Sequence, residues 1–135
     1  MKKIYIAGPI FTKADRDFLE KINELIKGIG FETYLPHKDG GIFIRGVNKS
    51  EDFFRKDIES INSSDIIVAI LNGTDSDSGT AWEIGFAYSK NLPIIGFLED
   101  TRKPHIDLLN PMIVNSIKKI ARNKEELKGL LEELK

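Results

Sequence analysis

The segment Asp65 to Leu71 (DIIVAIL) constrains the fold more than any other part of the chain. After its first residue it is wholly apolar and rich in β-branched side chains. It lacks the alternation of apolar and polar residues that is typical of a strand with one side facing solvent. Strands buried on both faces occur mainly in parallel sheets that helices cover on both sides. The segment therefore predicts an α/β protein.

Short apolar runs and helical stripes alternate along the rest of the chain. Further strands are predicted over Lys3–Gly8, Phe31–Leu35, Pro93–Leu98 and Ile117–Ile120. Helices are predicted from a Thr12 cap to Gly28–Gly30, from a Ser50 cap through Ile61, and over Gly79–Lys90, Leu108–Asn115 and Asn123–Leu134. Parallel strands need crossover connections of this kind. We predict one domain, residues 1–135, with a flavodoxin- or Rossmann-like three-layer sandwich around a five-stranded parallel sheet.

Composition excludes several classes of partner and cofactor. Apolar residues make up 41% of the 135-residue chain and charged residues 30%, with a net charge of −1. A chain balanced in this way is neither disordered nor suited to coating a polyanion, so no nucleic acid polymer is expected as a partner. There is no cysteine, and the two histidines lie far apart in the sequence. No metal and no cofactor are expected.

The N-terminal segment is too short for a signal peptide or a membrane span. Its apolar stretch, Ile4 to Ile10, already contains Gly8 and Pro9. We therefore expect a cytoplasmic protein without a membrane partner.

Ligands of parallel α/β sheets bind at the carboxyl ends of the strands. The loops after Ile6, Leu35, Leu71 and Leu98 are therefore the places to look. Residues 36–48 form a long glycine-rich segment, which is typical of loops that cover a ligand. Its His37, Asp39 and Arg45 have no partner spacing, which is more typical of solvated loop residues.

Glu83 is a candidate catalytic residue because it lies about one turn into a predicted helix. The helix dipole stabilises an anion there by about 0.3–1 kcal/mol, and a nucleophilic carboxylate must be ionised. Glu83 could equally do no more than complement the dipole. The small residues Gly79 and Gly85 beside it allow a ligand to approach closely. Trp82 and Phe86, four residues apart, are more typical of a core or a subunit interface than of base-stacking platforms.

Four motifs, in order and at compatible spacings, resemble one known family. They are Ile4–Phe11 (IYIAGPIF), Asp57 with Ile58, Ile61 and Asp65, Asp77-x-Gly79-x-x-x-Glu83-x-Gly85-x-Ala87, and Leu109–Ile113 (LNPMI). Each is weak alone, but together they are specific. The chain resembles the nucleoside 2-deoxyribosyltransferases and the related 2′-deoxynucleoside 5′-phosphate N-hydrolases.

The resemblance implies roles for three catalytic residues. Glu83 matches the nucleophile, which attacks the anomeric carbon and forms a covalent glutamyl-deoxyribosyl intermediate. Tyr5 matches the residue that orients this carboxylate, although a strand tyrosine is often only a core residue. Asp57 matches the acid that contacts the nucleobase and protonates its leaving nitrogen, and its alternative role is a solvated charge on a helix face.

The resemblance also implies a set of substrate-binding residues, namely Gly8, Phe11, Asp77, Gly79, Asn110 and Met112. Asp77 is also a good helix N-cap, and both roles are compatible. Asn110, with Met112 beside it, matches a residue that reaches the sugar hydroxyls from a neighbouring subunit. Its alternative is a turn asparagine before proline. A homodimer or larger homo-oligomer with shared active sites is therefore expected.

The loop after the first strand bears on the form of the substrate. It carries no arginine, and Asp77 would repel a phosphate, so a free deoxynucleoside and a free nucleobase are the expected small-molecule partners. Cleavage of 2′-deoxynucleoside 5′-monophosphates is the alternative, and a non-catalytic nucleotide-binding or signalling module is a further one. The chain departs from the transferases in ending on a charged helix rather than an aromatic residue.

Overall fold

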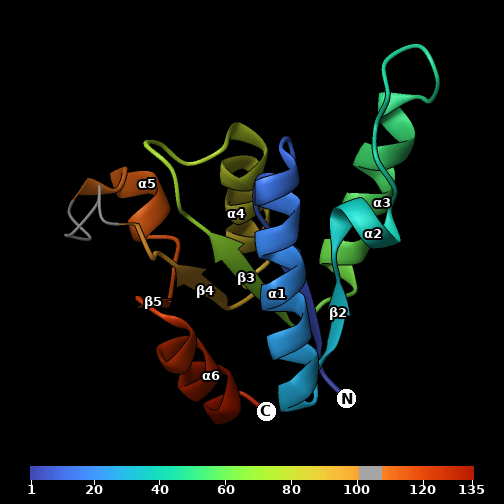
Figure 1. Ribbon diagram of the computed structural model, residues 1–135. Coiled ribbons are helices and arrows are strands. Elements are labelled where there is room, and N and C mark those ends of the chain that lie inside the picture. Colours follow the sequence, from blue (N-terminus) through green and yellow to red (C-terminus); the bar gives the residue numbers. More distant parts are fainter. Residues whose placement is uncertain (101–107) are drawn as a thin grey trace.

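The computed structural model describes residues 1–100 and 108–135 (Figure 1). Within these residues, five strands form one sheet in which every pairing is parallel. The strand order is β2-β1-β3-β4-β5. The strands are β1 (Lys3–Ala7), β2 (Glu32–Tyr34), β3 (Ile66–Ile70), β4 (Ile94–Phe97) and β5 (Lys119–Ala121). The predicted α/β class and five-stranded parallel sheet are confirmed.

Helices cover both faces of the sheet, which makes three layers. Helices α1 (Lys13–Ile29) and α6 (Lys124–Glu133) pack on one face and lie in front in Figure 1. Helices α3 (Ser50–Asn62), α4 (Ser78–Ser89) and α5 (Pro111–Val114) pack on the other. Successive strand residues point to opposite faces, so Ile4 and Ile6 pack with α1 while Tyr5 and Ala7 pack with α4. This alternation directs the Tyr5 phenol toward the α3 and α4 layer.

Capping explains where most of these helices begin. Thr12 and Asp15 form a reciprocal capping box at α1, and the carboxylate of Asp77 accepts a hydrogen bond from the Thr80 backbone at α4. The predicted Ser50 cap is wrong. Lys49 occupies the cap position of α3 without a side-chain hydrogen bond, and Ser50 is the first residue of the helix.

The segment after β2 differs from the predicted loop. Its first four residues form a short helix, α2 (Pro36–Asp39), in which the Asp39 carboxylate accepts a 2.7 Å hydrogen bond from the Leu35 backbone. His37 is buried and its Nε2 lies 3.3 Å from Oε1 of Glu20 on α1. The expectation of a solvated loop residue is therefore wrong for His37, because α2 packs this side chain against α1.

The chain leaves β1 toward one edge of the sheet and leaves β3 toward the other. At such a reversal the connecting loops diverge and leave a crevice at the carboxyl ends of the strands. The Gly8 loop and the start of α4 both follow these strand ends. The fold thus places the first and third motifs beside one crevice, and α3 brings Asp57 of the second motif to the same place. Within residues 1–100 and 108–135, every helix is too short or too polar to cross a bilayer.

Candidate active site

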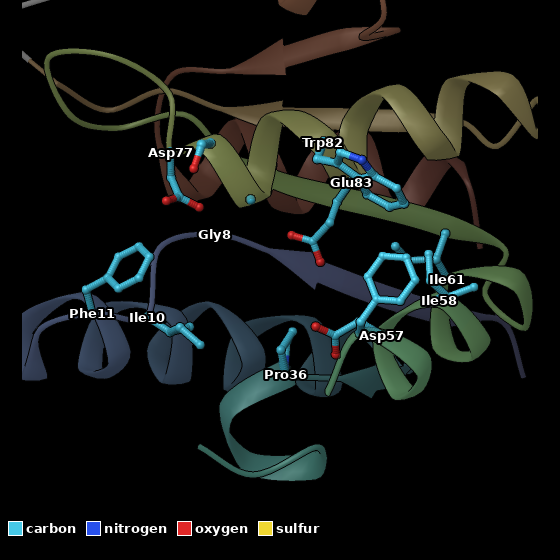
Figure 2. A pocket seen from close by; sticks show the side chains of 13 residues that line it. Gly8, Ile10, Phe11, Pro36, Asp57, Ile58, Ile61, Asp77, Trp82 and Glu83 are labelled. Carbon is cyan, nitrogen blue, oxygen red and sulfur yellow. The ribbon is translucent and has the colours of Figure 1, made fainter. Parts of the chain in front are cut away.

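A cavity of about 550 Å³ lies at this crevice, with α3 and α4 on two of its sides (Figure 2). Three carboxylates border it: Asp57 from α3, Asp77 from the α4 cap, and Glu83 from α4. The other lining residues are uncharged, namely Gly8, Ile10, Phe11, Pro36, Phe54, Ile58, Ile61, Ser78, Gly79 and Trp82. In the described part of the chain, no lysine, arginine or histidine borders the cavity. Three acids in a largely apolar pocket make this the candidate active site.

Tyr5 and Glu83 form the inner pair of the site. The Tyr5 ring is fully buried in β1, and its phenol donates a hydrogen bond to Oε2 of Glu83. Burial raises the pKa of Glu83 to about 8, the Tyr5 hydrogen bond opposes this shift, and the charges of Asp57 and Asp77 add to it. Burial, followed by the Glu83 charge, also moves the pKa of Tyr5 far above its ordinary value. Tyr5 therefore remains a donor that orients the Glu83 carboxylate.

Asp57 is the second acid of the site, and it is half-buried on α3. Burial raises the pKa of Asp57 to about 6, and hydrogen bonding by Tyr34 and Tyr5 opposes the shift. The Tyr34 phenol lies 3.4 Å from Oδ1 of Asp57. Asp57 is thus a partly desolvated acid in the cavity and not a solvated charge on a helix face.

Tyr34 was missed by the sequence reasoning. It ends β2 and lies opposite Tyr5 in the strand pairing. A tyrosine in each of the first two predicted strands was the available signal. The sequence carries no information on strand order, however, so it could not show that the two residues are neighbours across the sheet.

Two raised carboxyl pKa values in one cavity suit paired acid chemistry. Glycosidic bond cleavage uses one carboxylate as the nucleophile and one carboxylic acid as the proton donor to the leaving group. Glu83 and Asp57 could fill these two roles. Within residues 1–100 and 108–135, no three acidic, histidine or cysteine side chains are grouped so that they could hold a metal ion.

Asp77 lies both at the N-cap of α4 and at the edge of the cavity. Its carboxylate accepts hydrogen bonds of 2.9 Å from the backbone and from the hydroxyl of Thr80, and it also borders the cavity. The predicted N-cap is therefore confirmed. The neighbouring Gly79 borders the cavity without a side chain, which leaves room above the first turn of α4.

Gly8 and Phe11 border the cavity from the loop after β1. A Cβ atom on Gly8 would lie 2.7 Å from Cδ2 of Leu19 and 3.2 Å from Cβ of Ile70. A side chain at this position would crowd Leu19 and Ile70, so glycine allows the loop to pack closely over the end of the sheet. Phe11 is 75% exposed, so its ring forms part of the rim of the cavity.

An aromatic row continues the wall of the cavity. The rings of Phe54 and Trp82 meet edge to face at 5.6 Å, and Trp82 stacks on Phe86 at 5.4 Å. Trp82 is 50% exposed and borders the cavity. Trp82 is therefore not a core residue, and its alternative place in a subunit interface stays a prediction.

Asn110 and Met112 lie elsewhere. They border a second cavity of about 500 Å³ between α4 and α5, together with Tyr88. The Asn110 side chain caps α5 by accepting a 2.9 Å hydrogen bond from the Met112 backbone, and Met112 is 78% exposed. Within one chain, these two residues do not border the cavity that contains Glu83.

Several solved structures are similar to this chain over most of its length. A conserved protein from Enterococcus faecalis V583 is 28% identical, with 100% of this chain and 99% of that chain covered and a TM-score of 0.89. A 2-deoxyribosyltransferase from Bacillus psychrosaccharolyticus is 25% identical, with coverages of 93% and 90% and a TM-score of 0.77. A 2-deoxyribosyltransferase from Leishmania mexicana shares the fold, at 22% identity, 98% coverage of both chains and a TM-score of 0.75.

A family model described as nucleoside 2-deoxyribosyltransferase matches residues 4–127. No curated protein sequence matches the chain. The match covers β1 to the middle of α6, and so includes all five strands of the sheet and both cavities. The chain belongs to the nucleoside 2-deoxyribosyltransferase family.

Proposed function

We propose that this protein transfers the 2-deoxyribosyl group of a 2′-deoxynucleoside to another nucleobase, or to water, through a covalent intermediate on Glu83. The observation that carries this proposal is the pairing of Glu83 with the Tyr5 phenol in a cavity that also holds Asp57. A buried phenol with a strongly raised pKa does not compete for the reacting proton. It keeps one carboxylate oxygen engaged and leaves the other free to attack.

In the first step, the free oxygen of ionised Glu83 attacks C1′ of the sugar. The bond from C1′ to the base nitrogen breaks, and its electron pair goes to the base. Protonated Asp57 delivers its proton to the leaving base, which departs neutral while Asp57 becomes ionised. The raised pKa of Asp57, about 6, supports this role because Asp57 carries a proton near neutral pH more often than a carboxyl group with an ordinary pKa does.

In the second step, a nitrogen of the incoming base attacks C1′ and displaces the Glu83 carboxylate. Asp57 accepts the proton that the incoming base loses, so both carboxyl groups return to their starting states. Water can attack instead, which gives free deoxyribose. Each displacement inverts C1′, so the two together retain the configuration of the sugar.

The lining of the cavity favours a neutral substrate. Three carboxylates and no cation border it among the described residues, so a 5′-phosphate dianion would meet repulsion without a matching donor. The apolar wall, which includes Phe54, Ile58 and Trp82, suits the flat face of a nucleobase. A free deoxynucleoside therefore fits this cavity better than a deoxynucleoside monophosphate.

A second copy of the chain completes the site in this proposal. Asn110 and Met112 border a different cavity of their own chain, and Met112 projects into solvent. A homodimer or larger assembly would allow these residues to contact the sugar bound beside Glu83 of a neighbouring copy. The side chains are available for this because Asn110 borders the surface and Met112 packs against little of its own chain.

A product assay tests the proposal. The protein is incubated with deoxyinosine or thymidine plus free adenine, in parallel with deoxynucleoside monophosphates, and the products are separated by chromatography. We expect deoxyadenosine from the wild type and none from Glu83→Ala. Release of base from the monophosphates alone would replace the proposal by a monophosphate N-glycosidase. Binding without any turnover would leave a nucleotide-binding module.

A further inference from the structure

Two tyrosines lie side by side beneath the two acids. Tyr5 of β1 and Tyr34 of β2 are paired in the sheet, and their rings stack with centroids 5.5 Å apart and an interplanar angle of 14°. The Tyr5 phenol donates to Glu83, and the Tyr34 phenol lies 3.4 Å from Oδ1 of Asp57. Each carboxyl group of the reacting pair thus has a tyrosine of its own.

Each tyrosine has a single hydroxyl proton, so one tyrosine cannot donate a strong hydrogen bond to both acids at once. A phenol has one O–H and can donate one strong hydrogen bond at a time. The single proton of Tyr5 is engaged by Glu83. Although Tyr5 also lies near Asp57, Tyr34 is the tyrosine free to donate to the Asp57 carboxylate.

The surroundings of Tyr34 fix the position of its phenol. A Cβ atom on Gly40 would lie 2.6 Å from the Tyr34 hydroxyl oxygen and 2.9 Å from the carbonyl oxygen of Pro36. The turn after α2 therefore packs directly over the phenol and needs a glycine at this point. The Lys3 ammonium lies 5.7 Å from the ring centroid. Tyr34 is held by β2, by the Tyr5 ring and by this turn.

We propose that Tyr34 is a positioning residue for Asp57, and that its phenol holds the carboxyl group in the orientation from which it exchanges a proton with the nucleobase. The role corresponds to that of Tyr5 toward Glu83. The inference rests on the proposed function, because it assigns Tyr34 to the proton-transfer half of that reaction. Tyr34 acts through Asp57, and it is absent from the residues that border the cavity.

Two measurable properties follow from this position. The first is coupling, because a residue that acts through Asp57 has little left to contribute once Asp57 is removed. The second is the pKa of Asp57, because a hydrogen bond to the ionised carboxylate lowers it. The groups that face Asp57 are Tyr34 of β2, Tyr5 of β1, Glu83 of α4 and, on its own helix, Lys56. Removing the Tyr34 hydroxyl leaves the other three in place.

The first test is a double-mutant cycle with Tyr34→Phe and Asp57→Ala, assayed on the deoxynucleoside that the wild type cleaves fastest. Phenylalanine keeps the stacked ring and removes only the hydroxyl. We expect Tyr34→Phe to lower kcat by about 5- to 30-fold. In the Asp57→Ala background, the same change should alter kcat by less than about twofold. Ser89→Ala, which removes an exposed hydroxyl of α4 outside both cavities, serves as the control.

The proposal would be overturned if the double variant lost kcat by the product of the losses of Tyr34→Phe and Asp57→Ala. It would also be overturned if Tyr34→Phe kept the kcat of the wild type. The second measurement needs no turnover and therefore separates this inference from the proposed function. Carboxyl carbon NMR titration of the free protein should show the pKa of Asp57 raised by about half a unit or more in Tyr34→Phe. An unchanged Asp57 titration would show that the phenol does not hold this carboxyl group, whether or not the wild type turns over deoxynucleosides.

Discussion

The two cavities on either side of α4 are similar in size and different in chemistry. The first, of about 550 Å³, is bordered by Asp57, Asp77 and Glu83. The second, of about 500 Å³, is bordered by Asn110, Met112 and Tyr88 among others, with Asp75 as its one carboxylate. The first has a tyrosine hydrogen-bonded to each of two acids, and both acids have raised pKa values.

This difference suggests that the family motifs on the two sides of α4 have different roles. The groups that break and form bonds in the proposed reaction are gathered on one side of α4, where strand ends and burial can shift their pKa values. The groups expected to contact the sugar from a neighbouring copy lie on the other side, near solvent. Changes in the first cavity should therefore affect kcat, and changes in the second should affect KM.

The largest effect is expected from Glu83→Gln. The amide keeps the shape of the side chain but cannot act as the nucleophile, so kcat should fall by at least about 10³-fold. Steady-state kinetics of base exchange measures this. Glu59→Gln is the matched control because Glu59 is an exposed glutamate of α3 outside the cavity, and its kcat should equal that of the wild type. A Glu83→Gln enzyme with near-normal kcat would contradict the assignment of the reaction to the first cavity.

The next largest effect is expected from Asp57→Asn. Loss of the proton donor should lower kcat by about 10²-fold, within the range usual for general acids. The measurement is kcat across nucleosides whose leaving bases differ in basicity. The loss should be greatest for the base that is hardest to expel unprotonated, and an equal loss for every base would assign Asp57 to substrate binding instead.

A smaller effect, confined to KM, is expected from Asn110→Ala. Removal of one hydrogen-bonding side chain from the sugar site should raise KM by about tenfold and leave kcat within about twofold. Mixing this variant with Glu83→Ala after dissociation and reassembly should produce some sites with both residues intact. Recovery of a low-KM activity supports shared sites. An activity that keeps the high KM of the Asn110→Ala protein after mixing contradicts them.

The pH dependence should reflect the acid pair. The reacting form has Glu83 ionised and Asp57 protonated, so the pair must carry one proton. Because the pKa of Glu83 lies above that of Asp57, this form is a minor but constant fraction of the singly protonated pair. Apparent pKa values of about 6 and about 8 predict a maximum of kcat/KM between these values and about tenfold losses per pH unit beyond them. Asp57→Asn should lose the alkaline limb, and its acidic limb should move up toward the pKa of Glu83. A flat wild-type profile from pH 5 to 9 would contradict the assignment.

The smallest expected effect concerns stability. The pKa of Glu83 in the fold, about 8, lies above the value of about 4.5 in an unfolded chain, so ionisation of Glu83 weakens folding as pH rises through this window. Glu83→Gln should raise the free energy of unfolding at pH 9 by about 1–3 kcal/mol, since the partly open site screens some of the charge. At pH 4 the two proteins should unfold alike in denaturant. A destabilised variant at pH 9 would show that Glu83 is not strained by burial.

Much of the fold could be predicted because its signals are local. The apolar run ending at Leu71 predicts a buried strand wherever it lies, and Thr12 and Asp77 cap their helices through contacts three residues away. The Ser50 prediction failed because a serine near a helix start can occupy either the cap or the first turn. The helix at Pro36 was missed because Pro, Lys, Asp and Gly in sequence are equally typical of loops.

The candidate site was predictable only where a motif marked it. Glu83, Asp57 and Tyr5 were found because the family motifs include them, and the structure brings all three together. Neither Tyr34 nor Trp82 is one of the specified residues of a family motif. Their positions depend on which strand neighbours β1 and on which side of α4 faces α3, and both facts follow from long-range packing. Short spacings in the sequence do not contain this information.

The most direct test of the central claim is to trap the covalent intermediate. The wild type is mixed with a deoxynucleoside in the absence of an acceptor base, quenched in acid, digested and analysed by mass spectrometry. We predict one deoxyribosyl group on the peptide that contains Glu83, its loss when adenine is added before the quench, and its absence in Glu83→Gln. Turnover that proceeds without this adduct and releases sugar of inverted configuration would contradict a nucleophilic role for Glu83.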